Sequence, residues 1–267
     1  MIRDLQFPNS AWVRAPERFV LRDGRLGLMS IPVRYGTFTH PEAGHCLIDT
    51  GYTRRVTKGR RSLPLNIYNA VLRPRLTRHA LPDAKPLVDT IILTHLHADH
   101  VAGLKDYPQA RIITDRAALM HFLEPGASRL RHGVFRELLP EDIIDRVTDF
   151  SEFAAIECPY GLGPGRDLLG DGSVVALPLP GHMRGHTGIC FPDETRPLLY
   201  AVDAQWLHRA VMENRLPGAP ARWILDDVEA CQRSADRIRQ FCEAGGRVVY
   251  CHDPASPVST EEGNGTA

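Results

Sequence analysis

The sequence lacks an excess of charge of either sign and lacks long apolar runs. Its 267 residues include 32 Lys and Arg against 32 Asp and Glu, so its formal net charge is zero and gives no general attraction to nucleic acid or to an anionic membrane. No apolar run approaches the roughly 18 residues of a membrane-spanning helix, and the first 30 residues have no apolar core of a signal peptide. We therefore expect a cytoplasmic protein that binds neither nucleic acid nor a membrane.

Cysteine is also scarce, and its spacing is uninformative. The six cysteines form no CxxC pair, and a chain of this length can fold without disulfides. Several of them stand inside apolar runs, where a cysteine usually acts as a small buried hydrophobe. We expect reduced cysteines that pack in the core.

The remaining sequence is typical of one globular domain, predicted over residues 1–254. Six short apolar runs are rich in β-branched residues and predict buried strands: these are 44–49, 90–94, 110–114, 173–177, 197–203 and 247–252. Apolar residues recur every three or four positions after Asp226, which with Glu229 resembles a capping box, and Gly245 would end this helix. A second helix is predicted from Asp115 to Pro125. The pattern indicates an α/β protein.

Three segments are expected to lie outside this core. Residues 52–82 contain no acidic residue but eight Lys and Arg, so we predict a basic insertion or arm there. It is interpreted either as a solvated cover or dimer arm, or as a docking site for an anionic group of the substrate. Residues 159–172 contain five glycines and are predicted to be a loop. The polar tail, 255–267, is predicted to be disordered.

Histidine is the residue type that stands out, with 12 in the chain. Directly after the predicted strand that ends at Thr94, four side chains able to bind a metal occur within six residues: His95, His97, Asp99 and His100. Imidazole and carboxylate together suit zinc, iron or manganese. A metal site at this strand end is therefore predicted.

The HxHxDH motif resembles the signature of the metallo-β-lactamase superfamily. Other strand ends are similar to further motifs of that family in the same order: IDTG at 48–51, PGHMRGHT at 180–187, Asp203 after an apolar strand, and His252 after another. The resemblance implies the four-layer αββα sandwich, with two mixed sheets packed face to face and helices outside.

The same resemblance implies a ligand set for two divalent ions. His95, His97 and His182 would hold one ion, Asp99, His100 and His252 the other, and Asp203 would bridge them. Zinc is the first expectation for both, and iron and manganese are the alternatives. Two such ions would share a hydroxide that is a nucleophile at neutral pH, and Asp99 would orient it and carry a proton to the leaving group.

Around the ligands, the resemblance implies that Asp49 lies beneath the metals, with His186 and Thr94 as further supporting residues. Lactonases of the family commonly have a tyrosine three residues after the bridging aspartate, where it holds the substrate carbonyl; here that residue is Trp206. Tyr160 or Tyr35 would have to replace its hydroxyl. The usual Thr-Pro after the ligand histidine is Met183-Arg184 here, so Arg184 is expected to contact an anionic group.

The flanking motifs are similar to the N-acyl-homoserine lactonase branch. The first hypothesis is therefore a dinuclear metal hydrolase that opens a lactone or a related carboxylic ester. The alternative is a thioesterase acting on an acyl-CoA or acyl-carrier conjugate, whose phosphates the basic segment would meet. The expected partner is a small-molecule ester, lactone or thioester, and a homodimer is considered because of the arm.

Overall fold

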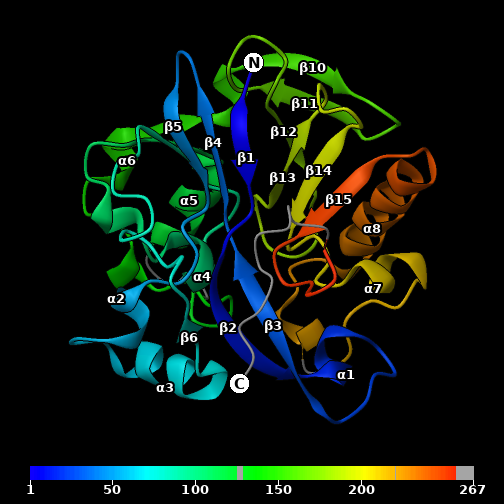
Figure 1. Cartoon of the computed structure of the whole chain (residues 1–267). Helices are drawn as coiled ribbons and strands as arrows, with labels where there is room; N and C mark the ends of the chain where they lie inside the picture. Colours follow the sequence, from blue (N-terminus) through cyan, green and yellow to red (C-terminus); the bar gives the residue numbers. More distant parts are fainter. Residues whose placement is uncertain (125–128, 220, 257–267) are drawn as a thin grey trace.

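Two six-stranded sheets form the centre of the molecule (Figure 1). This computed structural model describes residues 1–124, 129–219 and 221–256. The first sheet has the strand order β1 (Arg3–Gln6), β4 (Gly36–His40), β5 (Gly44–Ile48), β7 (Thr90–Ile92), β8 (Arg111–Thr114), β9 (Val147–Asp149). The second has the order β10 (Ala154–Cys158), β11 (Gly163–Asp167), β12 (Val175–Pro178), β13 (Thr187–Phe191), β14 (Leu198–Val202), β15 (Arg247–Tyr250).

The two sheets pack face to face through their aromatic residues. Phe38 of β4 meets Phe191 of β13 with ring centroids 6.1 Å apart, and Phe7 lies 4.8 Å from Tyr200 of β14. Burying one such side chain contributes roughly 1.5–3 kcal/mol. A smaller apolar cluster joins the outer face of the second sheet to α8 (Val228–Glu243) through residues such as Ile238 and Phe241.

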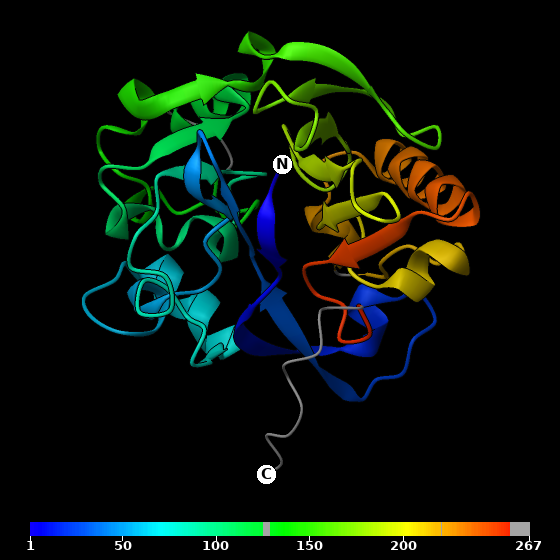
Figure 2. The same ribbon diagram turned by 45° about the horizontal axis from the view of Figure 1, so that its top comes forward.

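Helices cover the outer faces of both sheets, and Figures 1 and 2 show this four-layer arrangement. On the side of the first sheet lie α4 (Ala98–Val101), α5 (Arg116–Leu123) and α6 (Ile143–Arg146); on the other side lie α7 (His208–Met212) and α8. Short 3₁₀ turns follow at η1 (Leu104–Asp106), η2 (Arg136–Leu138), η3 (Phe150–Glu152) and η4 (Ala221–Ile224). The predicted αββα sandwich is thus confirmed, with both sheets mixed.

The predicted strands and helices occur where the apolar patterns place them, with one shifted helix start. Each of the six predicted strand runs overlaps a strand. The helix predicted from Asp115 is α5, and the Asp115 side chain caps it by accepting from the amide of Ala118. For α8 the capping residue is Asp227, which accepts from the amide of Ala230, and not the predicted Asp226. Both aspartates can cap a helix, and here the tertiary position of the chain decides between them.

The prediction of a loop over 159–172 was wrong for part of the segment. Residues Gly163–Asp167 form β11, which pairs with β10 on one side and β12 on the other. A Cβ on Gly165 would lie 2.5 Å from Val175 and 2.7 Å from the carbonyl oxygen of Ala176. The glycines that suggest a loop here permit the close approach of neighbouring strands.

A third, small sheet was not anticipated from the sequence. It has the order β3 (Leu28–Arg34), β2 (Asn9–Pro16), β6 (Arg75–Leu76) and lies across one end of the sandwich, next to α1 (Glu17–Val20) and α3 (Leu63–Leu72). Strand β6 belongs to the basic segment, as do α2 (Arg54–Thr57) and α3. Through β6 this segment is attached to the N-terminal strands. We call α3 and the three-stranded sheet together the cover.

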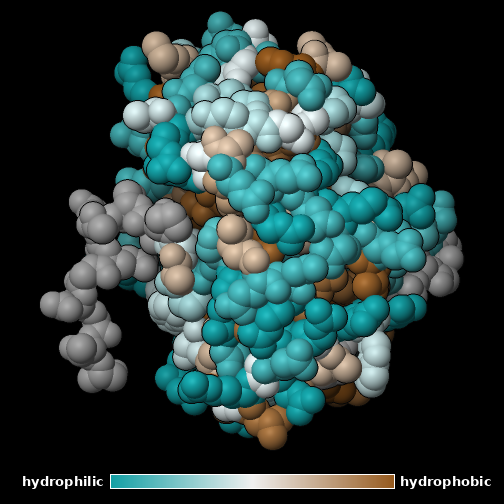
Figure 3. All heavy atoms as spheres, turned by 90° about the vertical axis from the view of Figure 1, so that its right-hand side faces the viewer, coloured by the Kyte–Doolittle hydropathy of each residue, from teal (hydrophilic) through white to brown (hydrophobic). Residues whose placement is uncertain are grey.

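The surface and the end of the chain add three observations. Hydrophilic residues predominate on the face that carries α7 and α8 (Figure 3). No helix in the described part of the chain is long and apolar enough to cross a membrane. Within the predicted disordered tail, Ser256 is buried and its hydroxyl accepts a hydrogen bond from the amide of Tyr250, whereas residues 257–267 lie outside the described residues.

Candidate metal centre

The predicted ligands gather where strands of both main sheets end. Strands β5 and β7 are parallel neighbours, so Asp49 and the segment beginning at His95 leave the same edge of the first sheet. Strands β14 and β15 are likewise parallel, and they deliver Asp203 and His252 to one edge of the second sheet. The side chains of all four residues are buried. The two halves of the sandwich therefore each contribute part of one centre.

Three imidazoles and a carboxylate form the first group of this centre. His97 Nδ1 lies 3.1 Å from His95 Nε2 and 3.0 Å from His182 Nε2. Asp203 Oδ2 is 3.4 Å from His182 Nε2 and 3.9 Å from His95 Nε2. Their ligand atoms all lie within 4.8 Å of one another, as a bound ion requires. These are the residues that the family resemblance implies for the first metal, together with the implied bridging aspartate.

The second group surrounds the other side of the Asp203 carboxylate. Asp203 Oδ2 is 3.6 Å from His100 Nε2 and 3.2 Å from His252 Nε2. Asp99 Oδ2 is 3.6 Å from His100 Nε2 and 3.4 Å from His252 Nε2. The four residues whose ligand atoms all lie within 4.8 Å of one another here are His100, Asp203, His252 and Cys251; the predicted ligand Asp99 lies beside this group and not within it. The Cys251 thiol donates to the carbonyl oxygen of Arg34. Asp203 thus belongs to both groups, which is the position of a bridging ligand.

Asp49 lies beneath the centre and orients two of its histidines. Its Oδ2 accepts from His100 Nδ1 at 2.8 Å and from the hydroxyl of Thr94 at 2.8 Å, while its Oδ1 accepts from the Thr94 amide. Because the Thr94 hydroxyl donates to Asp49, it accepts from His95 Nδ1 at 3.1 Å. Both imidazoles therefore carry a proton on Nδ1 and turn Nε2 toward the centre.

His186 supports the centre from behind and is not a ligand in either group. Its Nδ1 donates to the carbonyl oxygen of Leu179, and its Nε2 accepts from the backbone amide of Asp203. Burial lowers the pKa of His186 to about 3, so the ring is neutral and can accept this hydrogen bond. Next to it, Val202 has a left-handed φ of 53°, which is strained for a β-branched residue and aims Asp203 into the centre.

The loop that carries His182 is held against α8 by a glycine. Gly181 has φ 123°, and a Cβ at this position would lie 2.1 Å from the amide nitrogen of Cys231. Its carbonyl oxygen accepts from the amides of Asp226 and Asp227 at the start of α8. Any side chain at residue 181 would push the loop from the helix and displace His182.

The charges of the centre fit bound cations. Burial lowers the pKa values of His95 and His97 well below the usual range, so both are neutral imidazoles with lone pairs to share. Burial tends to raise the pKa of Asp203, but His252 and His100 hold it well below its ordinary value. Burial opposes a charge on these two histidines, yet the neighbouring carboxylates raise the pKa of both well above the usual range, so the second group holds positive charge, which a metal ion would supply in place of the protons. Among the described residues, His100 Nε2 and Asp203 Oδ1 are buried without a hydrogen-bond partner. A buried polar atom without a partner is costly, and a metal ion held by these two residues would satisfy it.

A cavity of about 430 Å³ opens over the ligands. His97, Asp99, His182, Asp203 and His252 form its polar floor, while its walls include Val13, Ala15, Phe19, Ile31, Val71 and Leu72. The apolar residues come from β2, β3, α1 and α3, the third sheet and the helices beside it. An apolar group next to the reacting atoms would find complementary walls here.

Of the three residues predicted to bind substrate, only Trp206 lines this cavity. Its ring centroid is 5.9 Å from that of His182. Tyr160 packs on Phe241 of α8, and Arg184 is exposed outside the cavity lining. Tyr35 is buried and donates to the carbonyl oxygen of His79, so neither tyrosine considered from the sequence reaches the centre.

The structure instead places Tyr52 and Tyr68 in the cavity lining, together with Arg131 and His132. The hydroxyls of Tyr52 and Tyr68 are 2.8 Å apart. Burial raises the pKa of both tyrosines, and the carboxylate of Asp99 adds to it, so both are protonated at neutral pH. No local motif marks these residues; the one available signal is that Tyr52 directly follows the IDTG turn.

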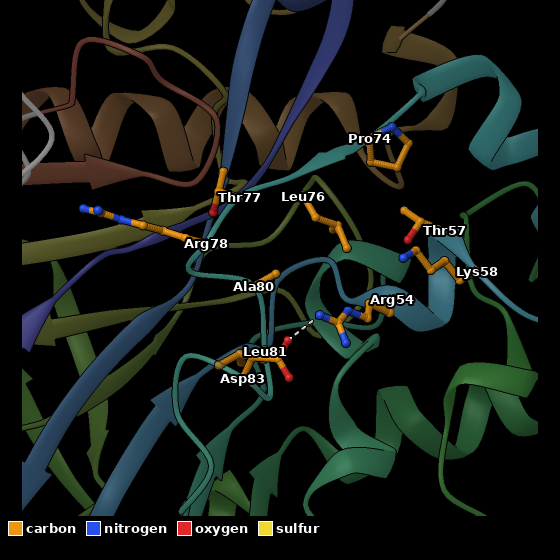
Figure 4. A pocket seen from close by; sticks show the side chains of 10 residues that line it. All are labelled: Arg54, Thr57, Lys58, Pro74, Leu76, Thr77, Arg78, Ala80, Leu81 and Asp83. Atoms are coloured by element: carbon orange, nitrogen blue, oxygen red, sulfur yellow. Dashed lines mark ion pairs between the residues drawn. The ribbon is translucent and has the colours of Figure 1, made fainter. Parts of the chain in front are cut away.

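The basic segment forms a separate cavity of about 390 Å³, shown in Figure 4. Arg54, Thr57 and Lys58 of the α2 region face Leu81 and Asp83 across it, and Arg54 is paired with Asp83 at 2.7 Å. Arg78 points away from this group (Figure 4). None of its lining residues belongs to the cavity over the ligands. Those cations of the basic segment that line a cavity therefore lie outside the cavity over the ligands.

Comparison with known protein families shows to which family this chain belongs. Residues 38–241 match the family described as the Metallo-beta-lactamase superfamily. The chain belongs to this superfamily. Among curated proteins, the N-acyl homoserine lactonase AttM of Rhizobium johnstonii is 28% identical over 241 residues, which cover 85% of this chain and 83% of that protein. AttM of Agrobacterium fabrum is 28% identical and covers 84% of this chain and 82% of its own length.

Solved structures of the superfamily share the fold at lower identity. An N-acyl homoserine lactone hydrolase with its product N-hexanoyl-L-homoserine at the catalytic metal centre superposes with a TM-score of 0.70 and 19% identity, covering 95% of this chain and 94% of that one. The dizinc quorum-quenching lactonase AidC gives a TM-score of 0.60 and 13% identity, covering 97% and 90%. The protein is thus a metallohydrolase of this superfamily, with two buried His/Asp groups consistent with a dinuclear site.

Proposed function

We propose that the protein is a dinuclear metal hydrolase that opens a lactone, or a related carboxylic ester, bearing an apolar acyl group. The observation that carries this proposal is the position of both ligand groups on the floor of one apolar cavity. The ring of a small ester would meet the polar floor, and its acyl chain would lie along the walls from β2, β3 and α3. The 28% identity to N-acyl homoserine lactonases supports the same substrate class.

Two divalent ions, zinc first, would be held by His95, His97 and His182 on one side and by Asp99, His100 and His252 on the other, with the Asp203 carboxylate near both groups. When bound, such ions polarise an ester carbonyl and lower the pKa of water enough to make it a nucleophile near neutral pH. Asp49, through its hydrogen bonds to His100 and Thr94, holds the imidazoles in the tautomers that binding needs.

Asp99 is the residue proposed to move protons. Its side chain borders the cavity, and its Oδ2 faces His252 at 3.4 Å. A carboxylate there can accept a proton from the attacking water and return it to the alkoxide oxygen that leaves when the ring opens. His186 and Val202 hold the backbone of Asp203 so that its carboxylate remains between the two groups.

A thioester with a phosphate-bearing carrier is the less favoured substrate. Such a carrier needs cations near the mouth of the reactive cavity. Arg131 is the one Lys or Arg residue in the described lining of that cavity, and it already donates to the carbonyl oxygen of Trp223. Three cations of the basic segment, Arg54, Lys58 and Arg78, line the separate cavity of Figure 4, where Arg54 is paired with Asp83. The lactone therefore fits this site better.

The test is a substrate panel on protein whose metal content has been measured. Acyl homoserine lactones, acyl-CoA thioesters and phosphodiesters are compared at matched concentration, with chains from four to twelve carbons. We expect two metal equivalents and the highest kcat/KM on a lactone with a medium or long chain. A protein that carries two metals and turns over no lactone or ester of the panel would refute the proposal.

A further inference from the structure

Of the two phenolic protons of Tyr52 and Tyr68, one has no acceptor among the described protein groups. Each hydroxyl has one proton to donate, and the 2.8 Å contact between Tyr52 and Tyr68 uses one of the two. No other hydrogen bond of either hydroxyl is present among the described residues. The second proton must therefore point either into protein or into the cavity.

Burial decides which tyrosine keeps the spare proton. Tyr52 is 1% exposed, whereas Tyr68 is partly exposed in the cavity. If Tyr68 donated to Tyr52, the Tyr52 proton would be buried without an acceptor, which costs about 1–3 kcal/mol. The favoured arrangement has Tyr52 donating to Tyr68 and the Tyr68 proton directed into the cavity. A donor already polarised by another hydroxyl is also a stronger donor.

Tyr68 is held in place by its capped helix and by the ring of Phe135. Ser62 caps α3 by accepting from the amide of Leu65, and its own amide donates to the carboxylate of Glu137. The Tyr68 ring packs edge to face on Phe135 at 5.1 Å. Gly133 lies between this ring and the imidazole of His97: a Cβ there would be 3.8 Å from Tyr68 and 3.6 Å from His97. The phenol is therefore a fixed donor beside the ligand groups.

On the wall that carries Trp206, the cavity has no matching hydroxyl, because an indole ring offers only an N–H donor. We propose that Tyr68 donates its hydrogen bond to the carbonyl oxygen of the bound ester, where negative charge develops as water attacks. Tyr52 is a positioning residue that acts through Tyr68. This inference rests on the proposed function, and it names a residue that stabilises the transition state of the proposed ester hydrolysis.

The experiment compares Tyr68→Phe, Tyr52→Phe and the double variant with the parent, all with metal content measured. The substrate is N-hexanoyl-homoserine lactone, and the ring-opened N-hexanoyl-homoserine is the ligand for calorimetry. Tyr68→Phe is expected to keep the parent's metal content and to lose about 10²-fold in kcat, with little change in KM. Its affinity for the ring-opened acid is expected to fall about tenfold, because a carboxylate oxygen loses a hydrogen bond.

The double variant separates the two roles. Tyr52→Phe should lose less than tenfold in kcat, since the Tyr68 hydroxyl remains, and Tyr52→Phe with Tyr68→Phe should equal Tyr68→Phe alone. Losses that multiply would overturn the positioning role of Tyr52. Tyr107→Phe is the matched control: it removes a buried phenolic hydroxyl that donates to the Lys85 carbonyl oxygen outside the cavity, and it should match the parent.

The parent's own behaviour distinguishes the two levels of failure. If the metal-loaded parent neither opens the lactone nor binds the acid, the proposed function fails, and the role of Tyr68 fails with it. If the parent is active and Tyr68→Phe retains its kcat and its affinity for the acid within twofold, the inference about Tyr68 alone is overturned.

Discussion

The floor of the reactive cavity is polar and buried, whereas its walls are apolar and partly exposed. The floor consists of buried residues at strand ends of the two main sheets. Beneath it, Asp49 accepts three hydrogen bonds, two from Thr94 and one from His100, and these orient the histidines of the floor. The walls come largely from the cover, where residues such as Val71 are mostly exposed and make apolar contacts. Under the proposed function we therefore expect the sandwich to supply the chemistry and the cover to select the substrate.

The strongest test of this comparison removes the residue shared by both ligand groups. Asp203→Ala is expected to lose both metals and at least about 10³-fold in kcat/KM, because its carboxylate belongs to each group. Elemental analysis and kinetics on the same sample measure the two effects. Retention of two metal equivalents would contradict the bridging role. Asp193→Ala, which changes an exposed aspartate in the turn after β13, serves as the control.

Asp99→Asn should separate proton transfer from metal binding. The amide keeps the size of the side chain but cannot accept a proton at neutral pH. We expect at least one metal equivalent to remain and kcat to fall by roughly 10²–10⁴-fold, the usual contribution of a general acid–base residue. Turnover equal to that of the parent would refute the role given to Asp99.

Asp49→Asn probes the support beneath the floor. An amide at this position has a single acceptor oxygen, so the bonds to Thr94 and His100 cannot all be kept. Metal affinity is expected to fall about 10–100-fold, while the substrate preference stays that of the parent. Competition with a chelator of known affinity measures the change; unchanged metal affinity would show that His100 does not need this partner.

Leu72→Ala probes the wall of the cavity instead of its floor. Removing apolar area should lower kcat/KM for long acyl chains by roughly fourfold to tenfold and for four-carbon chains by less than twofold. Metal content should be unchanged. Leu63→Ala on the same helix is the control, because Leu63 is exposed outside the cavity lining. An equal loss on short and long chains would contradict the separation of floor and wall.

The smallest effect is expected from the basic segment. Lys58→Glu together with Arg78→Glu leaves the Arg54–Asp83 pair in place and reverses two charges outside the reactive cavity. Lactone kcat/KM should change by less than twofold, and any thioester turnover should keep its salt dependence. A thioester rate that falls steeply and loses its salt dependence would support the alternative substrate and would tie this cavity to the chemistry.

Much of the fold was predictable because its signals are local. Strands β5, β7, β14 and β15 are short β-branched or aliphatic runs, and α8 shows a clear helical period. Strand β11 was not predictable, since Gly163 and Gly165 signal a loop until β10 and β12 pair with them. The cover was missed for a similar reason: β6 has two residues and exists through its pairing with β2.

The ligands belong to local sequence motifs, whereas some other buried residues owe their environment to contacts that are distant in the sequence. His40 illustrates a residue that local context does not describe: no motif marks it, but it is buried and lies 3.2 Å from Asp171, which is 131 residues away. Tyr68 is a further case, because an exposed-looking helix in the basic segment carries it to the ligand groups.

The sequence by itself determined the family, the strand ends and the set of side chains able to bind metals, because motif spacing and apolar periodicity are properties of neighbouring residues. Only the tertiary structure decided that Asp49 orients His95, through Thr94, and His100, that Arg184 and Tyr160 lie outside the cavity and that Tyr52 and Tyr68 lie within it. Those facts depend on contacts between residues far apart in the chain, and packing alone brings such residues together.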